Sequence, residues 1–412
     1  MKTKRKALLA CLAAVLLLCS CSQATGYVSS RHTPVQFDGH RVYGGIGGTQ
    51  ITSLSVDNGV YGPLCADPSC SHGMNDPSCG AYVGWGFGAM TMDGEGNLLA
   101  AARSDDNPSA YNVISVSPSS GERRYVLHEY PNSIGAMMVV GSRLYFLSQM
   151  KDEQKEDGEQ SGAYHVCSVS LRGGRVKALD LPDNDWYFAG ADTETLYLLG
   201  AYDRTLVAVS LNGKTSEPLS DGNTREVIHT FVSGESTDCY IDGDFLYLFD
   251  SRESVEVTAP WDGDEMIPEE ERTNTYSLYS VAKVDRGTGE VLARTETKVQ
   301  TTAWGYLSED GQTLYLHHFD PQAAGVYERN DGSLVYPVVR NPGVDVFDTA
   351  DMRLVETIPA EGFNVQAIAF AEEGEDKIVF YGGIYNPRLN WEMGWISRQT
   401  GKITMATAQW LN

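Results

Sequence analysis

The feature that most constrains the fold of this 412-residue chain is a short strand-like motif that recurs along its length. Each copy has an apolar residue at its centre, usually followed by tyrosine. The seven copies are Arg41-Val42-Tyr43, Asn97-Leu98-Leu99, Arg143-Leu144-Tyr145, Thr195-Leu196-Tyr197, Phe245-Leu246-Tyr247, Thr313-Leu314-Tyr315 and Lys377-Ile378-Val379. Their central residues are separated by 56, 46, 52, 50, 68 and 64 positions. Self-similarity at this spacing indicates an architecture built from repeated supersecondary units.

Turn residues on both sides of the motif predict the number of strands in each repeat. Before the motif stand Asp-Gly pairs such as Asp38-Gly39 and Asp242-Gly243, which fit tight hairpin turns. After it comes an alternating strand, such as Tyr111 to Val116, and then a second turn such as Thr288-Gly289-Glu290. A fourth strand completes the unit. Each repeat is therefore predicted to form a four-stranded antiparallel sheet.

Seven such repeats predict an all-β fold, a seven-bladed β-propeller, over residues 36–412. A blade can bury its two faces only against its neighbours, so the ring must close. The first and last repeats are the hardest to delimit, which leaves six or eight blades as alternatives. Because no helical periodicity and no linker interrupts the segment, we expect one domain.

Two of the turns resemble the blade turn of quinoprotein-type propellers. They are Asp285-Arg286-Gly287-Thr288-Gly289-Glu290 and Arg398-Gln399-Thr400-Gly401-Lys402. In that family a docking tryptophan follows the turn, and it is missing here. The resemblance therefore implies the fold and not the quinone chemistry.

Long insertions are predicted to gather on one face of the ring. If the strands of a blade are labelled A to D from the centre outwards, the A–B and C–D turns share one face. The B–C and D–A connections share the other face, which we call the long-loop face. Insertions between B and C span residues 149–163, 250–276, 319–343 and 382–392, and loops on a rigid scaffold commonly bind ligands. The candidate ligand-contacting aromatics are Trp261, Phe319, Tyr327, Tyr336, Tyr385 and Trp391. The alternative is that these rings pack the loops onto the blades.

A cysteine-rich segment, C-x4-C-x-H-x6-C, contains Cys65, Cys70, His72 and Cys79. By the strand order it is the D–A connection from the first blade to the second, so it belongs to the long-loop face. Three thiols and one imidazole form the ligand set of a closed, structural zinc site. The Asp-Pro pairs at 67–68 and 76–77 favour turns that fold the ligands inward. We therefore predict a structural zinc ion as cofactor.

Disulfide formation and free thiols are the alternatives for this segment. An exported protein can form disulfides. Three cysteines leave one unpaired unless it reaches Cys167 or Cys239, which lie in strand patterns typical of buried positions. His72 has no role in such a scheme. The C-x4-C-x-H pattern is similar to a segment of bacterial surface lipoproteins with a β-propeller domain. That resemblance covers the segment and the general layout, and it implies no activity.

The N-terminus predicts export and a lipid anchor. Basic residues from Lys2 to Lys6 precede an apolar stretch, Ala7 to Leu18, that is short for a permanent membrane helix, so residues 1–20 are predicted to be a removed signal peptide. Leu18-Cys19-Ser20-Cys21 resembles the bacterial lipobox, which implies lipid attachment at Cys21 and a tether over residues 21–35. The predicted location is extracytoplasmic, anchored to a bacterial membrane at the cell surface. An ordinary secretory signal is the alternative.

Charge and motif content narrow the function. The chain has 31 basic and 55 acidic side chains, and loss of the four basic residues of the signal changes the net charge from −24 to −28. A field of this sign repels nucleic acid. The sequence contains no Gly-x-Ser-x-Gly, His-Glu-x-x-His or phosphate-loop motif.

We therefore predict a binding module, non-enzymatic rather than catalytic, that binds a glycan or protein ligand through the long-loop face. Two alternatives stay open. One is a carbohydrate-active lyase or hydrolase that uses the same face. The other is a structural subunit of an envelope complex.

Overall fold

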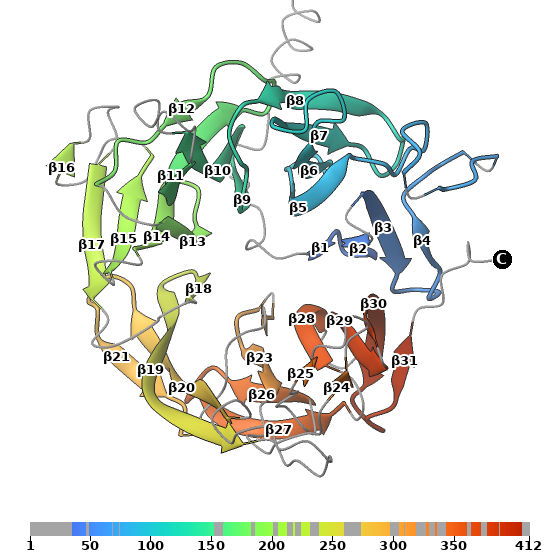
Figure 1. Ribbon diagram of the computed structural model, residues 1–412. Coiled ribbons are helices and arrows are strands. Elements are labelled where there is room, and N and C mark those ends of the chain that lie inside the picture. The colour runs from blue at the N-terminus through green and yellow to red at the C-terminus, as the bar shows by residue number, and fades with distance from the viewer. Residues whose placement is uncertain are drawn as a thin grey trace, which may run out of the picture.

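The computed structural model is a closed ring of seven antiparallel blades, which confirms the predicted seven-bladed β-propeller (Figure 1). It describes residues 35–46, 49–67, 69–73, 75–151, 160–182, 186–200, 205–211, 217–218, 224–230, 239–258, 273–296, 305–308, 310–318, 327–328, 334–335, 343–360, 364–371, 377–386 and 388–405. The predicted signal peptide, Cys21 and nearly all of the predicted tether lie outside the described residues. In the described part of the chain, no helix is long and apolar enough to cross a membrane.

The first three blades each contain four consecutive strands, ordered here from the centre outwards. Blade 1 contains β1 (Val35–Phe37), β2 (Arg41–Ile46), β3 (Gln50–Ser55) and β4 (Tyr61–Pro63). Blade 2 contains β5 (Trp85–Met92), β6 (Leu98–Arg103), β7 (Tyr111–Val116) and β8 (Arg123–Tyr130). Blade 3 contains β9 (Met137–Val140), β10 (Arg143–Lys151), β11 (Gln160–Ser170) and β12 (Lys177–Ala178).

The remaining blades follow the same order with two additions. Blade 4 contains β13 (Trp186–Ala191), β14 (Thr195–Gly200), β15 (Thr205–Ser210) and β17 (Thr224–Thr230), and the short β16 (Glu217–Pro218) pairs outside β17. Blade 5 contains β18 (Cys239–Asp242), β19 (Phe245–Thr258), β20 (Thr273–Asp285) and β21 (Val291–Arg294). Blade 6 contains β22 (Tyr306–Leu307), β23 (Thr313–His318), β26 (Gly343–Asp348) and β27 (Arg353–Pro359), with a separate hairpin of β24 (Tyr327–Glu328) and β25 (Leu334–Val335) inserted. Blade 7 contains β28 (Asn364–Ala371), β29 (Lys377–Asn386), β30 (Arg388–Ser397) and β31 (Ile403–Met405).

The recurring sequence motif forms the second strand of every blade, and its central residue is fully buried. The residues with 0% exposure are Val42, Leu98, Leu144, Leu196, Leu246, Leu314 and Ile378. Successive side chains of a strand point to opposite faces of the sheet. Leu246 accordingly packs against blade 4, and Tyr247 packs against blade 6. In the described clusters, the motifs of blades 2 to 6 each supply one residue to the interface with the preceding blade and one to the interface with the following blade.

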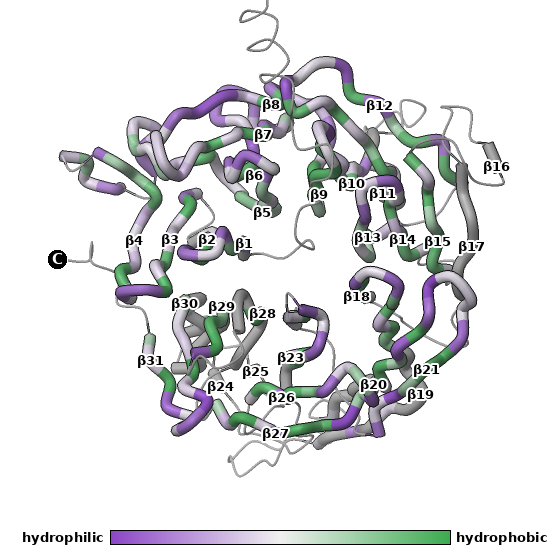
Figure 2. Tube along the Cα trace, turned by 180° about the vertical axis from the view of Figure 1, so that it is seen from behind, coloured by the Kyte–Doolittle hydropathy of each residue, from purple (hydrophilic) through white to green (hydrophobic). Residues whose placement is uncertain are grey.

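The core of the protein consists of separate apolar clusters between consecutive blades. Described clusters join blades 1 and 2, 2 and 3, 3 and 4, 4 and 5, 5 and 6, and 6 and 7. In Figure 2 the apolar residues follow the strands, and hydrophilic residues mark many of the turns. The ring closes where β1 contacts both β5 and β28, and the Lys377 Nζ donates to the Val56 carbonyl oxygen at 3.3 Å.

Arginines connect neighbouring blades at the two quinoprotein-like turns. Arg286 donates from Nη1 to Oδ2 of Asp192 at 2.9 Å, and its guanidinium lies 5.7 Å from the ring centre of Tyr197. The Tyr197 hydroxyl donates to the same carboxylate oxygen at 3.0 Å. Arg398 likewise lies over Tyr315, at 5.9 Å. Both arginines reach back to the preceding blade, so these turns hold blades 4 to 5 and 6 to 7 together without the missing tryptophan.

The described parts of two predicted long loops, residues 250–276 and 382–392, are paired strand, which corrects their description as loops. β19 and β20 stay paired out to Thr258 and Thr273, and β29 and β30 stay paired out to Asn386 and Arg388. β-Branched residues along the first hairpin favour the extended conformation and extend the blade beyond the ring. These insertions are therefore long hairpins of the B and C strands.

Candidate metal centre

The cysteine-rich segment, residues 64–83, connects β4 of blade 1 to β5 of blade 2, as predicted. In Figure 1 it projects from the rim of the ring between β4 and β8. Backbone hydrogen bonds attach both of its ends to blade 1. Leu64 N donates to Ile51 O at 2.8 Å, Ile51 N donates to Ala81 O at 2.9 Å, and Val83 N donates to Thr49 O at 2.8 Å. We call this segment the cysteine loop.

Two turns of the same design present Cys70 and Cys79. In the first, the Asp67 Oδ1 accepts hydrogen bonds from the Ser69 N–H at 2.8 Å and the Ser69 hydroxyl at 2.7 Å. In the second, the Asp76 Oδ1 accepts from the Ser78 N–H at 2.9 Å and hydroxyl at 2.6 Å. The amide of each following cysteine donates to the carbonyl oxygen of the same aspartate. The repeated Asp-Pro-Ser-Cys sequence thus builds two equivalent Asx turns, which confirms the predicted turns.

The structure brings the four predicted ligands together. One potential ligand atom from each of Cys65, Cys70, His72 and Cys79 lies within 4.8 Å of all the others. The His72 Nδ1 is 3.8 Å from the Cys79 Sγ. Among the described cysteines, Cys65, Cys70, Cys79 and Cys167 are free thiols. The cluster could therefore hold a metal ion.

Backbone N–H groups point at all three sulfur atoms of the cluster. The His72 N–H lies 3.4 Å from the Cys70 Sγ, where His72 itself has a φ of 54°. The N–H groups of Asp67 and Gly80 donate to the Cys65 sulfur, and that of Ala81 donates to the Cys79 sulfur. In each case one donor lies two residues after the cysteine. Such donors stabilise thiolate, which is the form that binds metal.

Burial and neighbouring groups set the pKa of two of these thiols in opposite directions. Burial acts to raise the pKa of Cys65, but the N–H donors and the adjacent thiols outweigh it and leave that pKa below its ordinary value. Burial is the largest effect at Cys79 and, together with the neighbouring Cys70 and Cys65 thiols, raises its pKa to about 12. A cation at the centre of the cluster would replace the protons on such thiols.

Side chains from both blades fix the loop in place. Gln50 of β3 donates from Nε2 to the carbonyl oxygens of His72 at 3.4 Å and Gly73 at 2.7 Å. Arg123 of β8 donates to the Cys79 carbonyl oxygen at 3.4 Å and to that of Tyr82. A Cβ at Gly80 would lie 3.3 Å from the Cys65 sulfur, so the backbone passes the cluster closely. The loop is thereby tied to blade 1 and blade 2 at once.

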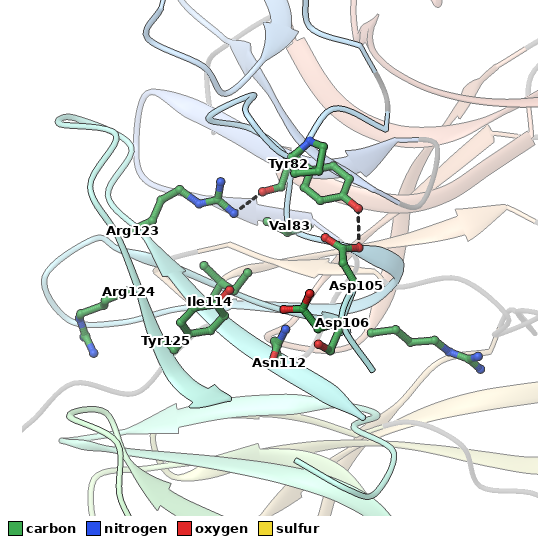
Figure 3. Close-up of a pocket in the computed structure, with 12 residues that line it drawn as sticks. Tyr82, Val83, Asp105, Asp106, Asn112, Ile114, Arg123, Arg124 and Tyr125 are labelled. Atoms are coloured by element: carbon green, nitrogen blue, oxygen red, sulfur yellow. Dashed lines mark hydrogen bonds between the residues drawn. The ribbon is translucent and has the colours of Figure 1, made fainter. Parts of the chain in front are cut away.

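Two hollows flank the cysteine loop. One, of about 550 Å³, borders the outer strands of blade 1 and reaches Cys70 and His72. The other, of about 350 Å³, lies against blade 2 (Figure 3). The cluster therefore lies between blade surfaces that carry two separate concave sites.

The predicted ligand-contacting aromatics are only partly placed. Trp261, Phe319 and Tyr336 lie outside the described residues. Tyr327 begins β24, and Tyr385 and Trp391 lie on the β29–β30 hairpin.

The structure adds exposed aromatic residues that the sequence reasoning missed. Trp85 of β5 is 54% exposed, and Tyr187 of β13 is 44% exposed. Both lie near the start of an innermost strand, which by the strand order is on the long-loop face. Tyr125 of β8, on the rim, is 54% exposed. The alternation of residues along a strand shows which side chains point to the same face of the sheet. It cannot show whether that face is open to solvent or covered by the next blade.

Fold and cluster together define a seven-bladed β-propeller with a Cys3His group between its first two blades. No family model matches the sequence, and no curated protein matches it.

Among solved structures, the chain is similar to a putative 6-phosphogluconolactonase from Bacteroides uniformis, with 12% identity over 92% of this chain and 95% of that chain and a TM-score of 0.47. The Myceliophteria thermophila Cps50 (Swd1) β-propeller domain matches with 11% identity over 75% and 82% of the two chains and a TM-score of 0.43. Kuenenia stuttgartiensis hydrazine synthase matches with 17% identity and a TM-score of 0.38, over 64% of this chain and only 62% of its own length. At these values the likenesses transfer no activity.

Proposed function

We propose that this chain is a lipid-anchored, extracytoplasmic β-propeller that binds a glycan or protein ligand through its long-loop face, with a zinc ion stabilising that face. The single observation that carries the proposal is the convergence of Cys65, Cys70, His72 and Cys79 on the loop that joins the first two blades. A long connection of this kind has almost no apolar core of its own. Holding it with a metal keeps a recognition surface in one shape.

Zinc is the metal best suited to the cluster. Thiolate and imidazole ligands favour Zn²⁺ over magnesium or calcium, and four protein ligands complete a tetrahedron. With no ligand position left for water, the ion has a structural role. The N–H groups directed at the sulfur atoms support this role, because they reduce the charge that three thiolates would concentrate in one place.

The metal content of the purified chain tests this assignment. Residues 24–412 are to be purified under reducing conditions without chelator, and zinc measured by elemental mass spectrometry. We expect about one zinc per chain, lost in Cys70→Ser and retained in Cys167→Ala, which removes a buried thiol outside the cluster. A metal-free chain with thiols missing on titration would instead show a disulfide.

Ligand binding is proposed for the long-loop face because, by the strand order, long hairpins and exposed aromatic rings lie on that side of the ring. The extended β19–β20 and β29–β30 hairpins lie on this side of their blades, and Trp85 and Tyr187 are exposed on innermost strands. Exposed aromatic rings offer an apolar face to sugars and peptides. Screening of the mature chain against glycan and peptide arrays is expected to give ligands whose binding weakens in Trp85→Ala and Tyr187→Ala. If neither change weakens ligand binding, the ligand binds at a site that does not include Trp85 or Tyr187.

Membrane attachment is proposed from the lipobox at Cys21. Replacement of Cys21 by Ser is expected to move the protein from the membrane fraction to the soluble extracytoplasmic fraction in a bacterial host. Membrane retention of that variant would contradict the lipid anchor.

A further inference from the structure

The hollow between the cysteine loop and blade 2 has the features of a small-molecule site. It measures about 350 Å³, within the range of ligand pockets. Val83, Ile114 and Asn112, all at most 6% exposed, belong to its lining. Tyr125, which is 54% exposed, lines it from β8 (Figure 3).

The Tyr125 ring is held in position while its surface stays open. The ring of His128 meets it edge-on, with ring centres 4.6 Å apart and planes at 75°. Both residues belong to β8, the outermost strand of blade 2. An aromatic ring that is fixed by its neighbour and exposed to solvent is a ready platform for stacking, because little side-chain freedom is lost on binding.

Polar groups around the platform keep hydrogen-bonding capacity available. The Asn112 Oδ1 accepts from the Glu129 N–H at 2.8 Å, so the Asn112 amide nitrogen remains a donor at this buried position. Asp105 uses Oδ1 to accept from the Tyr82 hydroxyl at 2.7 Å, which leaves its second oxygen. Asp106 makes no hydrogen bond to another described residue, and Figure 3 shows it directed toward Asn112. Arg103 and Arg124 also belong to the lining, but the Arg103 guanidinium lies 5.8 Å from the ring centre of Tyr111 and Arg124 donates to the Leu171 carbonyl oxygen.

The charges of the lining select against a strongly charged ligand. The lining contains two carboxylates, Asp105 and Asp106, and the three arginines Arg103, Arg123 and Arg124, so both signs of charge are present. Arg123 donates to backbone carbonyl oxygens of the cysteine loop, and Arg124 donates to the Leu171 carbonyl oxygen of blade 3 at 2.6 Å. A fixed positive or negative ligand charge would therefore meet repulsion from part of the lining. A neutral molecule with several hydroxyl groups can use the donors and acceptors alike.

We propose that this pocket binds one neutral pyranose ring, stacked on Tyr125 and hydrogen-bonded by Asp106 and Asn112. The site deepens the proposed binding function by naming its ligand class, and it rests on that proposal only for its biological purpose. It is separate from the exposed rings of Trp85 and Tyr187. A pyranose offers an apolar C–H face to the ring and hydroxyl groups to the rim.

The metal cluster forms one wall of this pocket indirectly. Pro77 lines the pocket and directly precedes Ser78 and Cys79, within the second Asx turn. Tyr82 and Val83 line it from the other end of the loop. Loss of the metal would release this wall, so sugar affinity depends on the occupied cluster.

The test is saturation-transfer NMR and titration of residues 24–412, as purified, with the methyl glycosides of glucose, galactose, mannose and N-acetylglucosamine. We expect at least one to bind with a dissociation constant on the order of 1–10 mM, as befits about a dozen heavy atoms. Tyr125→Ala is expected to weaken it at least about tenfold, and Asp106→Asn about threefold or more. Leu292→Ala, an exposed apolar residue on the distant β21, is the matched control and is expected to leave affinity unchanged.

Chelation provides a second readout that does not require a pocket variant to fold. Removal of zinc from the wild-type chain is expected to weaken the same glycoside at least about fivefold. Absence of saturation transfer from all four glycosides overturns the sugar site, as does binding that Tyr125→Ala leaves intact. Binding confined to glucuronate or to lysine-rich peptides overturns it in favour of a charged ligand. In each of these cases the zinc content and the array results still decide the proposed function separately.

Discussion

The ring and the cysteine loop achieve order by opposite means. In the ring, the central residues of the seven recurring motifs have 0% exposure, and apolar clusters are described at six interfaces between consecutive blades. In the described part of the cysteine loop, the local buried cluster consists of Cys79, Ala81 and Tyr82, with partly buried Leu64, Cys65 and Cys70 packed against it. The loop depends instead on two Asx turns, two anchoring side chains and one group of ligands. The stability of the ring therefore comes from many apolar contacts spread over its blades, whereas the conformation of the loop depends on a few polar contacts and ligand atoms.

This difference predicts different responses to damage. A defect in the ring is shared by two blades and spreads through the closed structure. A defect at the cluster removes the main constraint on one connection and leaves most blade interfaces untouched. The following changes test that contrast, from the largest expected effect to the smallest.

Leu246→Ala in the ring is expected to have the largest effect on global stability. The side chain is fully buried between blades 4 and 5, and its truncation leaves a cavity. We expect the free energy of unfolding to fall by about 2–5 kcal/mol in urea denaturation. The exposed Leu292 of β21 is the control, since Leu292→Ala should change it by less than about 0.5 kcal/mol. Equal effects of both changes would show that the blade interface is not the source of stability.

Cys79→Ser is expected to act locally. It removes a fully buried ligand of the cluster, so hydrogen exchange at Ala81 and Val83 should speed up by at least about tenfold. Exchange in β19 should stay unchanged, and the shift in global unfolding should be smaller than that of Leu246→Ala. Faster exchange throughout the ring would mean that the loop supports the whole fold.

Arg286→Lys tests the contact between blades 4 and 5. Lysine keeps the charge but loses the planar guanidinium that lies over Tyr197, and the ion pair with Asp192 is partly exposed. We expect a loss of about 0.5–1 kcal/mol in the free energy of unfolding. Arg353→Lys, at a more exposed ion pair, should have no measurable effect. A loss at Arg353 equal to that at Arg286 would argue against a specific contact between blades.

Acid should affect both regions in the same way, because both use aspartate turns. Side-chain and backbone donors lower the pKa of Asp310 in the ring and of Asp67 and Asp76 in the loop. A lowered pKa in the folded state stabilises the protein above the unfolded pKa of about 4, and this contribution is lost as pH falls below it. Urea denaturation across pH 3–6 is expected to show this small decline, reduced in Asp310→Asn. If the free energy of unfolding of Asp310→Asn falls with pH as steeply as that of the wild type, the Asp310 turn does not contribute to the decline.

The contrast also explains which features could be predicted from sequence. The second strand of each blade was predictable because alternation places Leu246 and Tyr247 on opposite, equally buried faces, and the motif repeats seven times. The ligand cluster was predictable because residue type and spacing carry its chemistry. The exposure of Trp85 and Tyr125 was not, because it depends on where the neighbouring blade ends. The extended hairpins were missed because polar strand residues such as Ser254 and Glu256 resemble loop residues.

The position of β1 limits how far the propeller can lie from the membrane. It is the innermost strand of blade 1, and by the strand order the chain enters it from the long-loop face. With lipid attachment at Cys21, as proposed, the 14 residues that lead to Val35 could extend to at most about 50 Å. The propeller would thus be attached to the membrane by a tether that joins it close to the axis of the ring. Its ligands would have to be found within a shallow layer above the membrane rather than in the surrounding medium.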